Sequence, residues 1–236
     1  MYCHLHVHGE YSLLDGSIRT DKLVERAKEL GMEAIALTDH GSMYGVIHFY
    51  KACKKAGIRP IIGCEVYVAP RSRFQKEPGL DDYQYHLVLL AQNKKGYENL
   101  SNLVSRAYVE GFYYKPRIDK KLLEEYSEGL IVLSGCLGGE VAQLLLNNKY
   151  EEAKDVAKWF KKIFKDKYFL EIQDHGLVEQ KHINPQLIRL SRELDIPLVA
   201  TNDVHYLTKE DAKVHDILLC IQTGKKVNDI DRMRFD

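Results

Sequence analysis

The stretch Cys3-His4-Leu5-His6-Val7-His8 places three histidines two residues apart. Successive side chains of a β-strand point to opposite faces, so this spacing predicts three imidazoles on one face and two apolar side chains on the other. Imidazole nitrogens are common ligands for zinc, manganese and iron, and a rigid strand can direct several of them at one ion. The stretch therefore predicts a strand that binds metal. The alternative is that these histidines lie in the core and form hydrogen bonds with backbone groups.

Strand-like apolar runs alternate with helical patterns along the rest of the chain. We expect strands near residues 3–8, 34–38, 59–68, 84–91, 130–134, 167–173 and 197–201, with helices between most of them. The runs IAL and LVLLA are apolar on both faces, which is typical of parallel strands covered by helices. The pattern predicts an α/β fold, and the short, regular strands favour a barrel without excluding an open sheet. Residues 69–83 hold two of the six prolines and predict a long surface loop.

Composition narrows the class of protein. Of the 236 residues, 45% are hydrophobic, yet no apolar run approaches the roughly 20 residues of a membrane span, and the amino terminus lacks a signal-peptide pattern. We therefore expect a cytoplasmic protein without a membrane partner. Lysine plus arginine equals aspartate plus glutamate at 34 each, so the net charge indicates no partner. The five scattered cysteines lack CxxC spacing, which argues against disulfides and a zinc ribbon.

Side chains that bind metals follow or occupy almost every predicted strand. Ligands of parallel α/β folds gather at the carboxyl ends of strands, so we expect these side chains to converge. The candidate metal ligands are His6, His8, Asp15, His40, Glu65, His86, Cys136, Asp203 and His205. A tetrahedral ion takes about four donors, so this set predicts two or three metals. Clustered metals that activate water suit phosphate hydrolysis, and we assign the carboxylates of Asp15, Glu65 and Asp203 to catalysis through a metal-held water.

Other polar residues have plainer interpretations. His48, His182 and His215 lie on predicted helices, where a solvated or hydrogen-bonded histidine is the usual case. His4 lies deeper on its strand and is expected in the core or behind a ligand. His175, just past the sixth strand, is a candidate substrate contact. Asp39 precedes His40 and is expected either to cap the next helix or to orient a ligand.

The order of motifs along the chain resembles a known family. HLHVH with a downstream aspartate, TDHG, GCE, YHL, SGC and NDVH occur in the order found in the PHP (polymerase and histidinol phosphatase) family. The segments EYSLLDG, ALTDHGSMYG, GFYYKPRID, DILLCIQTGK and the terminal RMRF resemble one branch of it, the PHP domains of bacterial replicative DNA polymerases. The resemblance extends over almost the whole chain.

This resemblance implies a fold, a site and an activity. The fold would be a distorted seven-stranded (β/α) barrel, with residues 1–227 as the PHP domain and residues 228–236 as the start of a linker to polymerase domains. All nine ligand positions of the family hold competent donors here, which implies a metal-dependent 3′–5′ exonuclease acting on DNA. His6 and His8 would share one ion with Glu65 and Asp203. Glu65 would bridge to a second ion on His86 and Cys136, and Asp15, His40 and His205 would hold the third.

The implied metals are zinc, manganese or iron, and the implied partners are a DNA 3′ end, the rest of a polymerase chain and other replisome subunits. Lys115 and Arg117, in GFYYKPRID, are candidate phosphate contacts, and Tyr113 and Tyr114 are available to stack on a base. An ordinary surface loop is the alternative for this segment.

Two other functions stay open on the sequence alone. One is a free-standing phosphatase of the histidinol-phosphate type, which would use the same metals on a small phosphate monoester. The other is a non-catalytic module whose metals stabilise the fold or dock a proofreading subunit. The polymerase-like GFYYKPRID and the polar, uncapped tail from Asn228 favour a module of a longer polymerase chain.

Overall fold

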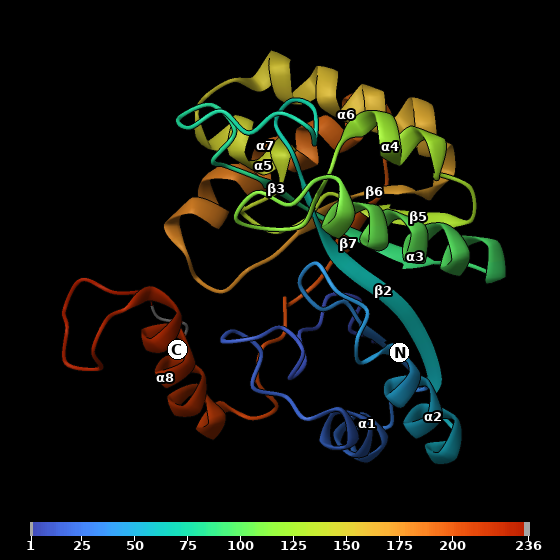
Figure 1. Ribbon diagram of the computed structural model, residues 1–236, viewed down its shortest axis with the longest axis vertical. Helices are drawn as coiled ribbons and strands as arrows, with labels where there is room; N and C mark the ends of the chain where they lie inside the picture. Colours follow the sequence, from blue (N-terminus) through green and yellow to red (C-terminus); the bar gives the residue numbers. More distant parts are fainter. Residues whose placement is uncertain (1, 234–236) are drawn as a thin grey trace. The chain divides into compact units, whose positions relative to one another are not determined.

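The computed structural model describes residues 2–233 (Figure 1), and the terminal Arg234-Phe235-Asp236 of the predicted linker lies outside them. Two compact units make up the chain. The first unit comprises residues 1–62 and 203–236 as far as they are described, and the second comprises residues 63–202. The strand β2, Arg59–Val68, begins in the first unit and ends in the second.

Helices and one parallel strand pair form the first unit. Its further elements are α1 (Thr20–Glu29), β1 (Ala34–Leu37), α2 (Val46–Ala56), the 3-10 helix η2 (Lys209–Asp211) and α8 (Ala212–Thr223). β1 pairs in parallel with the start of β2, with Ala34 opposite Arg59. The apolar stripe of α1 and the buried face of α2 enclose a core that includes Leu23, Ile35 and Phe49. Gly31 and Gly57 follow the two helices with positive φ, a conformation that glycine adopts readily where a helix ends.

The histidine-rich residues 3–8 lie beside β1 but do not form a regular strand. Val7 makes only an isolated parallel bridge to Val204, while the carbonyls of His4 and Val7 accept from the amides of Ala36 and Thr38. The amide of Val7 donates to the hydroxyl of Thr38 at 2.8 Å. A side-chain acceptor therefore replaces a backbone carbonyl, and the ladder is interrupted where the sequence predicts a continuous strand.

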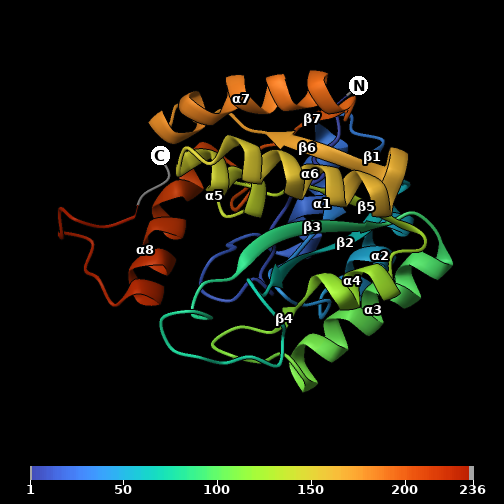
Figure 2. The same cartoon turned by 90° about the horizontal axis from the view of Figure 1, so that it is seen from above.

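The second unit contains most of the sheet (Figure 2). Its strands after β2 are β3 (Tyr85–Ala91), β4 (Arg117–Ile118), β5 (Leu130–Leu133), β6 (Tyr168–Ile172) and β7 (Leu198–Ala200). Its helices are α3 (Lys94–Val109), α4 (Lys120–Glu125), α5 (Glu140–Leu146), α6 (Tyr150–Phe164), the 3-10 helix η1 (Lys165–Lys167) and α7 (Val178–Leu194). The strands pair in the order β2-β3-β5-β6-β7, and β4 pairs with β2.

Strand direction differs from the all-parallel expectation. β3 runs antiparallel to both β2 and β5, whereas β5–β6 and β6–β7 are parallel. Residues 69–84 join β2 to β3 without a helix, and two strands joined by a loop return antiparallel, whereas a parallel return usually needs a helical crossover. The described residues form seven strands, as predicted, but β4 takes the place of residues 3–8 in that count. The α/β class is confirmed.

Large apolar side chains fill the core of the second unit. Phe160 of α6 stacks on Tyr168 of β6 with ring centroids 5.0 Å apart, and Leu100 and Leu103 of α3 are fully buried. Packed aromatic and aliphatic side chains of this kind supply most of the free energy that stabilises a fold. Within residues 2–233 we find no helix with the length and hydrophobicity needed to cross a membrane.

Candidate metal centres

Six of the nine predicted ligands lie in the first unit, and the structure brings them together. We call His6, His8, Asp15, His40, Asp203 and His205 the first-unit cluster. The Nε2 atoms of His6 and His8 lie 3.2 and 3.1 Å from Oδ1 of Asp203. Two imidazole nitrogens thus face one carboxylate oxygen, and the alternating spacing of HLHVH predicts that these two histidines share a face.

Asp203 reaches this position through an unfavourable backbone conformation. Its φ is +46°, in the left-handed region that residues with a Cβ rarely adopt. Backbone hydrogen bonds fix the next residue, because His8 N donates to the Val204 carbonyl at 2.8 Å and Val204 N donates to the His6 carbonyl at 3.0 Å. Such strain persists where surrounding contacts enforce it, and it concentrates at functional sites.

Asp15 gathers the other histidines of the first-unit cluster. Its Oδ2 lies 2.9 Å from Nε2 of His40, and its Oδ1 lies 3.6 Å from Nε2 of His205. The rings of His40 and His205 both stack on His8, at centroid distances of 4.0 and 4.4 Å. His8 therefore connects the two carboxylates: its Nε2 faces Asp203, and its ring contacts both histidines that lie near Asp15.

The charges of this cluster are strongly coupled. Burial, together with the neighbouring His40 and His205, lowers the pKa of His8 to about 3. Burial opposes ionisation of Asp203 and Asp15, but the facing histidines outweigh it and hold the pKa of both carboxyls well below the usual range. A neutral imidazole and ionised carboxylates are the protonation states that bind a cation.

Ser12 and Asp39 form hydrogen bonds that help to position His8 and His40 of the first-unit cluster. Oδ1 of Asp39 accepts from the hydroxyl of Ser12 at 2.8 Å and from the amide of Gly9 at 2.7 Å. The oxygen of Ser12 lies 3.1 Å from Nδ1 of His8 and accepts from the amide of His40 at 3.1 Å. Of the two predicted roles for Asp39, the geometry supports orientation of a ligand, acting through Ser12.

His215 is a member of this site that sequence reasoning missed. It lies on α8 with 1% of its surface exposed, and its Nε2 lies 3.6 Å from Oδ1 of Asp15. Of the two expectations for a helix histidine, solvation is wrong here, because α8 buries His215 with Leu219 and Cys220 and exposes apolar Val214 and Ile217. Because apolar side chains lie on both faces of α8, its sequence pattern does not show that His215 is on the buried face. No sequence motif includes this histidine.

The other three predicted ligands meet in the second unit. We call Glu65, His86 and Cys136 the second-unit cluster. Oε1 of Glu65 lies 3.2 Å from Nδ1 of His86 and 3.8 Å from Sγ of Cys136, and the sulfur lies 3.7 Å from Nδ1 of His86. β2 and β3 present the first two residues, with Glu65 paired opposite Val88, and the turn after β5 presents the cysteine.

A glycine-rich turn makes the approach of Cys136 to His86 possible. Gly135 has a φ of +86°, and a Cβ there would lie 2.7 Å from the carbonyl oxygen of His86. A Cβ on Gly138 would lie 3.0 Å from the His86 ring. The motif SGCLGG therefore lets the backbone lie directly against the histidine that its cysteine faces.

Arg117 has a structural role instead of the predicted phosphate contact. It is 0% exposed, and its guanidinium donates to the carbonyls of Gly111, Asp81 and Gln75 at 3.1, 3.0 and 2.8 Å. These carbonyls belong to the loop after β2 and to the segment before β4, so the arginine ties them together. The prediction is wrong for this residue because irregular backbone needs buried donors, and Arg117 supplies them.

The remaining predicted substrate contacts have accessible side chains. Lys115 is exposed, with its ammonium 5.5 Å from the Tyr67 ring. The rings of Tyr113 and Tyr114 lie 4.5 Å apart, and the Tyr113 hydroxyl donates to Asp82 at 3.0 Å. His175 is exposed and lies 2.9 Å from the Asn202 carbonyl through Nε2. Their contact with substrate stays a prediction.

The donor sets fit divalent metal ions. Within the first unit, the ligand atoms of His6, His8 and Asp203 lie within 4.8 Å of one another, as do those of His8, His40 and His205. Nitrogen and carboxylate oxygen donors of this kind suit zinc, manganese and iron, and the thiolate in the second-unit cluster is softer. The residues present are therefore competent to hold metal ions.

The fold and these donor sets define a PHP domain. The family model described as "PHP domain" matches residues 4–175 of the chain. The match covers more than half of the chain and includes seven of the nine predicted ligands. The chain belongs to the PHP domain family, and the resemblance indicated by its motifs is confirmed.

The polymerase branch is confirmed as well. The chain is 51% identical over 236 residues to DNA polymerase III subunit alpha of Borreliella burgdorferi, with 100% of this chain and 21% of the relative covered. It is 53% identical to that of Treponema pallidum and 47% identical to that of Thermus aquaticus, each with 99% of this chain and 20% of the relative covered. The chain is homologous to the N-terminal PHP region of DNA polymerase III alpha subunits. It spans about a fifth of the length of the curated relatives it matches.

Solved structures of low identity share the fold. One, described as a candidate metal-dependent phosphoesterase from Bifidobacterium adolescentis, aligns with a TM-score of 0.55 at 14% identity over 88% of each chain. Another, a two-domain protein of Bacteroides vulgatus said to contain a PHP-like metal-dependent phosphoesterase, aligns with a TM-score of 0.51 at 17% identity over 95% of this chain and 55% of the other. They confirm the PHP-type fold.

Proposed function

We propose that this protein hydrolyses phosphodiester bonds at a DNA 3′ end, as a 3′–5′ exonuclease module of a DNA-synthesising polymerase. The observation that carries the proposal is the convergence of four predicted histidine ligands on Asp15 and Asp203, in a chain homologous to replicative polymerases. The second-unit cluster adds three further donors. A cytoplasmic location, with the rest of a polymerase and other replisome subunits as partners, belongs to the same proposal.

Divalent ions bound here would supply Lewis-acid chemistry, which makes water more acidic and neutralises phosphate charge. In this proposal His6, His8 and Asp203 would hold one ion, and His40, His205 and Asp15 would hold another. Glu65, His86 and Cys136 would provide a further set of donors. The carboxylates of Asp15, Glu65 and Asp203 are the proposed catalytic residues, each acting through a metal-held water in its own unit.

Two exposed residues are proposed for the substrate. The Lys115 ammonium is accessible and carries a charge that a phosphate can neutralise. The exposed His175 offers an imidazole just past β6. Arg117 is not included, because its donors are used by buried carbonyls.

The test measures nucleotide release from 3′-labelled single-stranded and duplex DNA by the purified protein, after chelation and with zinc, manganese or iron restored singly. Asp203→Asn should lower the rate by more than about 100-fold, since even residues behind metal ligands commonly contribute 10–100-fold. Asp21→Asn, an exposed aspartate of the same unit, is the matched control and should leave the rate unchanged.

Histidinol phosphate serves as the competing substrate. Phosphate release from it without nucleotide release from DNA would favour a small-molecule phosphatase. Retained metal and fold without either activity would favour a structural or docking module and would overturn the proposal.

A further inference from the structure

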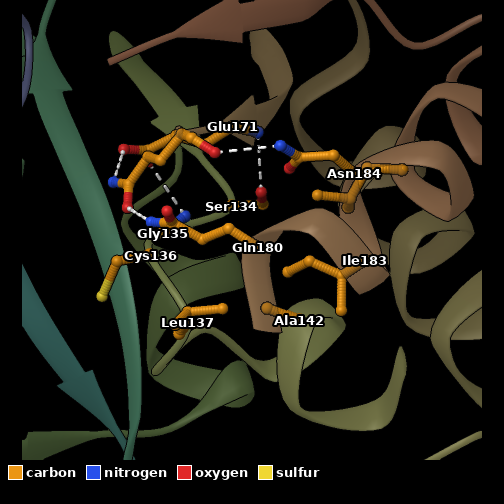
Figure 3. Close-up of a pocket in the computed structure, with 11 residues that line it drawn as sticks. Ser134, Gly135, Cys136, Leu137, Ala142, Glu171, Gln180, Ile183 and Asn184 are labelled. Atoms are coloured by element: carbon orange, nitrogen blue, oxygen red, sulfur yellow. Dashed lines mark hydrogen bonds between the residues drawn. The ribbon is translucent and has the colours of Figure 1, made fainter. Parts of the chain in front are cut away.

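Glu171 is a buried carboxylate that belongs to neither cluster. It lies on β6 with 2% of its surface exposed, inside the second unit (Figure 3). A buried carboxylate costs stability unless hydrogen-bond donors surround it. Oε1 accepts from the Gln173 amide at 3.0 Å and from the Thr201 hydroxyl, and Oε2 accepts from the Gly135 amide at 3.2 Å.

The donors around Glu171 are themselves held in place. The Gln173 side-chain oxygen accepts from the Gln180 amide at 3.4 Å, so the nitrogen of Gln173 is directed at Glu171 and Thr201. Asn184 donates to the Gln173 backbone carbonyl at 2.9 Å. Residues of α7 and the segment after β6 thus fix which atoms face the carboxylate.

Glu171 also holds the turn that carries Cys136. Its backbone amide donates to the Ser134 hydroxyl at 2.8 Å, and its carboxylate accepts from the next residue, Gly135. The two residues that directly precede Cys136 are therefore both bonded to Glu171. The Cys136 sulfur points away from this polar group (Figure 3), and it lies 3.7 Å from His86 and 3.8 Å from Glu65.

We propose that Glu171 is a positioning residue, whose carboxylate fixes the Ser134–Gly135 turn so that the Cys136 sulfur faces His86 and Glu65. The inference rests on the proposed function only in taking this sulfur as a metal ligand. Glu171 itself touches neither substrate nor metal. A glutamine in its place keeps the size but turns one acceptor oxygen into a donor, which would then face the donors now bonded to it.

The test uses Glu171→Gln with two readouts, one without metal and one with cobalt. In the metal-free protein, iodoacetamide labelling of Cys136 is followed by peptide mass spectrometry, with the partly buried Cys3 of the first unit as internal reference. Freed from Glu171, the turn should open more often, and labelling of Cys136 should accelerate by about fivefold while Cys3 is unchanged. With Co²⁺, the thiolate-to-cobalt charge-transfer absorption should fall by at least about half.

Leu170→Val on the same strand is the matched control for lost stability. It should lower the melting temperature without changing either readout, because the Gly135 amide keeps its acceptor. Thr201→Val, which removes one donor only, provides a milder variant if Glu171→Gln does not fold, and it should change both readouts in the same direction.

Labelling and cobalt absorption of Glu171→Gln that match those of Leu170→Val would overturn the positioning role. Absence of the charge-transfer band in the unaltered protein would instead contradict the proposed metal site. The labelling rates would still decide the role of Glu171 in that case.

Discussion

Ser12 determines which nitrogen of His8 is presented to the first-unit cluster. Its hydroxyl hydrogen is donated to Asp39, so its oxygen can only accept from the nearby Nδ1 of His8. Nδ1 of His8 must then carry the proton, and Nε2, 3.1 Å from Asp203, is the basic nitrogen that a cation needs. One hydroxyl thus selects both the tautomer and the orientation of a candidate ligand.

Ser12→Ala should weaken metal binding by about 10-fold or more, because groups behind metal ligands commonly contribute 10–100-fold to affinity. Competition with a chromogenic chelator measures the change. Ser127→Ala, which removes an exposed hydroxyl of the second unit, is the control and should bind metal like the unaltered protein. Equal affinities for the two variants would contradict a role for Ser12 in presenting His8.

His215 should matter for the cluster although no motif marks it. Its Nε2 lies 3.6 Å from Asp15 in a buried position, so His215→Gln should lower nucleotide release by about 10-fold by disturbing that carboxylate. The exposed helix histidine His182 supplies the matched His182→Gln control. Rates that agree for both variants would show that His215 only fills space.

At the level of elements, turns and loops position the functional side chains. The turn after β5 lies against His86 through Gly135 and Gly138. Residues 69–83 form the predicted surface loop, and ion pairs hold it in place: Arg73 contacts Glu110 at 2.6 Å and Asp119 at 3.0 Å. Both segments are irregular, so buried polar groups replace the regular hydrogen bonds of helices and strands.

Gly135→Ala should destabilise the protein by about 2–4 kcal/mol, because a positive φ and a close backbone contact act together. Gly176 has a similar φ of +79° but nothing within 4 Å of a built Cβ. Gly176→Ala should therefore lose only about 1 kcal/mol. Urea unfolding of both variants measures the difference, and equal losses would show that the contact with His86 is unimportant.

The Arg73–Asp119 pair should make stability depend on pH. Burial raises the pKa of Asp119, but hydrogen bonds from the Arg73 and Leu122 amides and the Arg73 charge outweigh it and hold the pKa below its usual range. A group with a lowered folded-state pKa stabilises above its unfolded value and loses this contribution as pH falls through the folded value. Asp119→Asn should cost about 2–3 kcal/mol at pH 7, and less below about pH 4.

Urea unfolding of the metal-free protein at pH 7 and pH 3 measures this dependence. Asp166→Asn removes an exposed aspartate and should change little at either pH. A loss for Asp119→Asn that is the same at both pH values would contradict the assignment of the charge.

On the scale of the whole molecule, candidate ligands join distant parts of the chain. Asp203 and His205 complete a cluster whose other members lie before residue 41. Asp15 alone faces His40, His205 and His215, which α8 and two loops supply. Bound cations would thus link segments far apart in sequence.

Removing metal should lower the melting temperature of the protein. A ligand at 100 times its dissociation constant stabilises the folded state by about 2.7 kcal/mol, and its removal takes this contribution away. Calorimetry before and after chelation, with zinc, manganese or iron restored singly, measures the effect. Asp203→Asn should show a smaller shift than Asp21→Asn, and an unchanged melting temperature on chelation would contradict metal binding.

Much of the fold and most of the candidate site follow from the sequence. Hydrophobic periodicity is local, so it predicts β1, β2, β3, β5, β6 and β7 close to where they occur. The alternation in HLHVH predicts that His6 and His8 share a face, and both do face Asp203. The order of the motifs indicates the PHP family, because each motif is a short stretch of sequence that contains one or two candidate ligands near the end of a strand.

Only the tertiary structure decides which distant groups meet. Arg117 is buried because it donates to the carbonyls of Asp81 and Gln75, which lie more than 30 residues away. The motif GFYYKPRID does not indicate which distant carbonyls its arginine will contact. The position of β3 between β2 and β5 likewise depends on the folded chain. The positions of His215 beside Asp15 and of Glu171 beside Gly135 also depend on long-range packing. The sequence by itself thus determines which side chains can bind a metal, through residue types and their spacing. The tertiary structure decides which partner each buried polar group has, because every such group needs a hydrogen-bond partner in the folded chain.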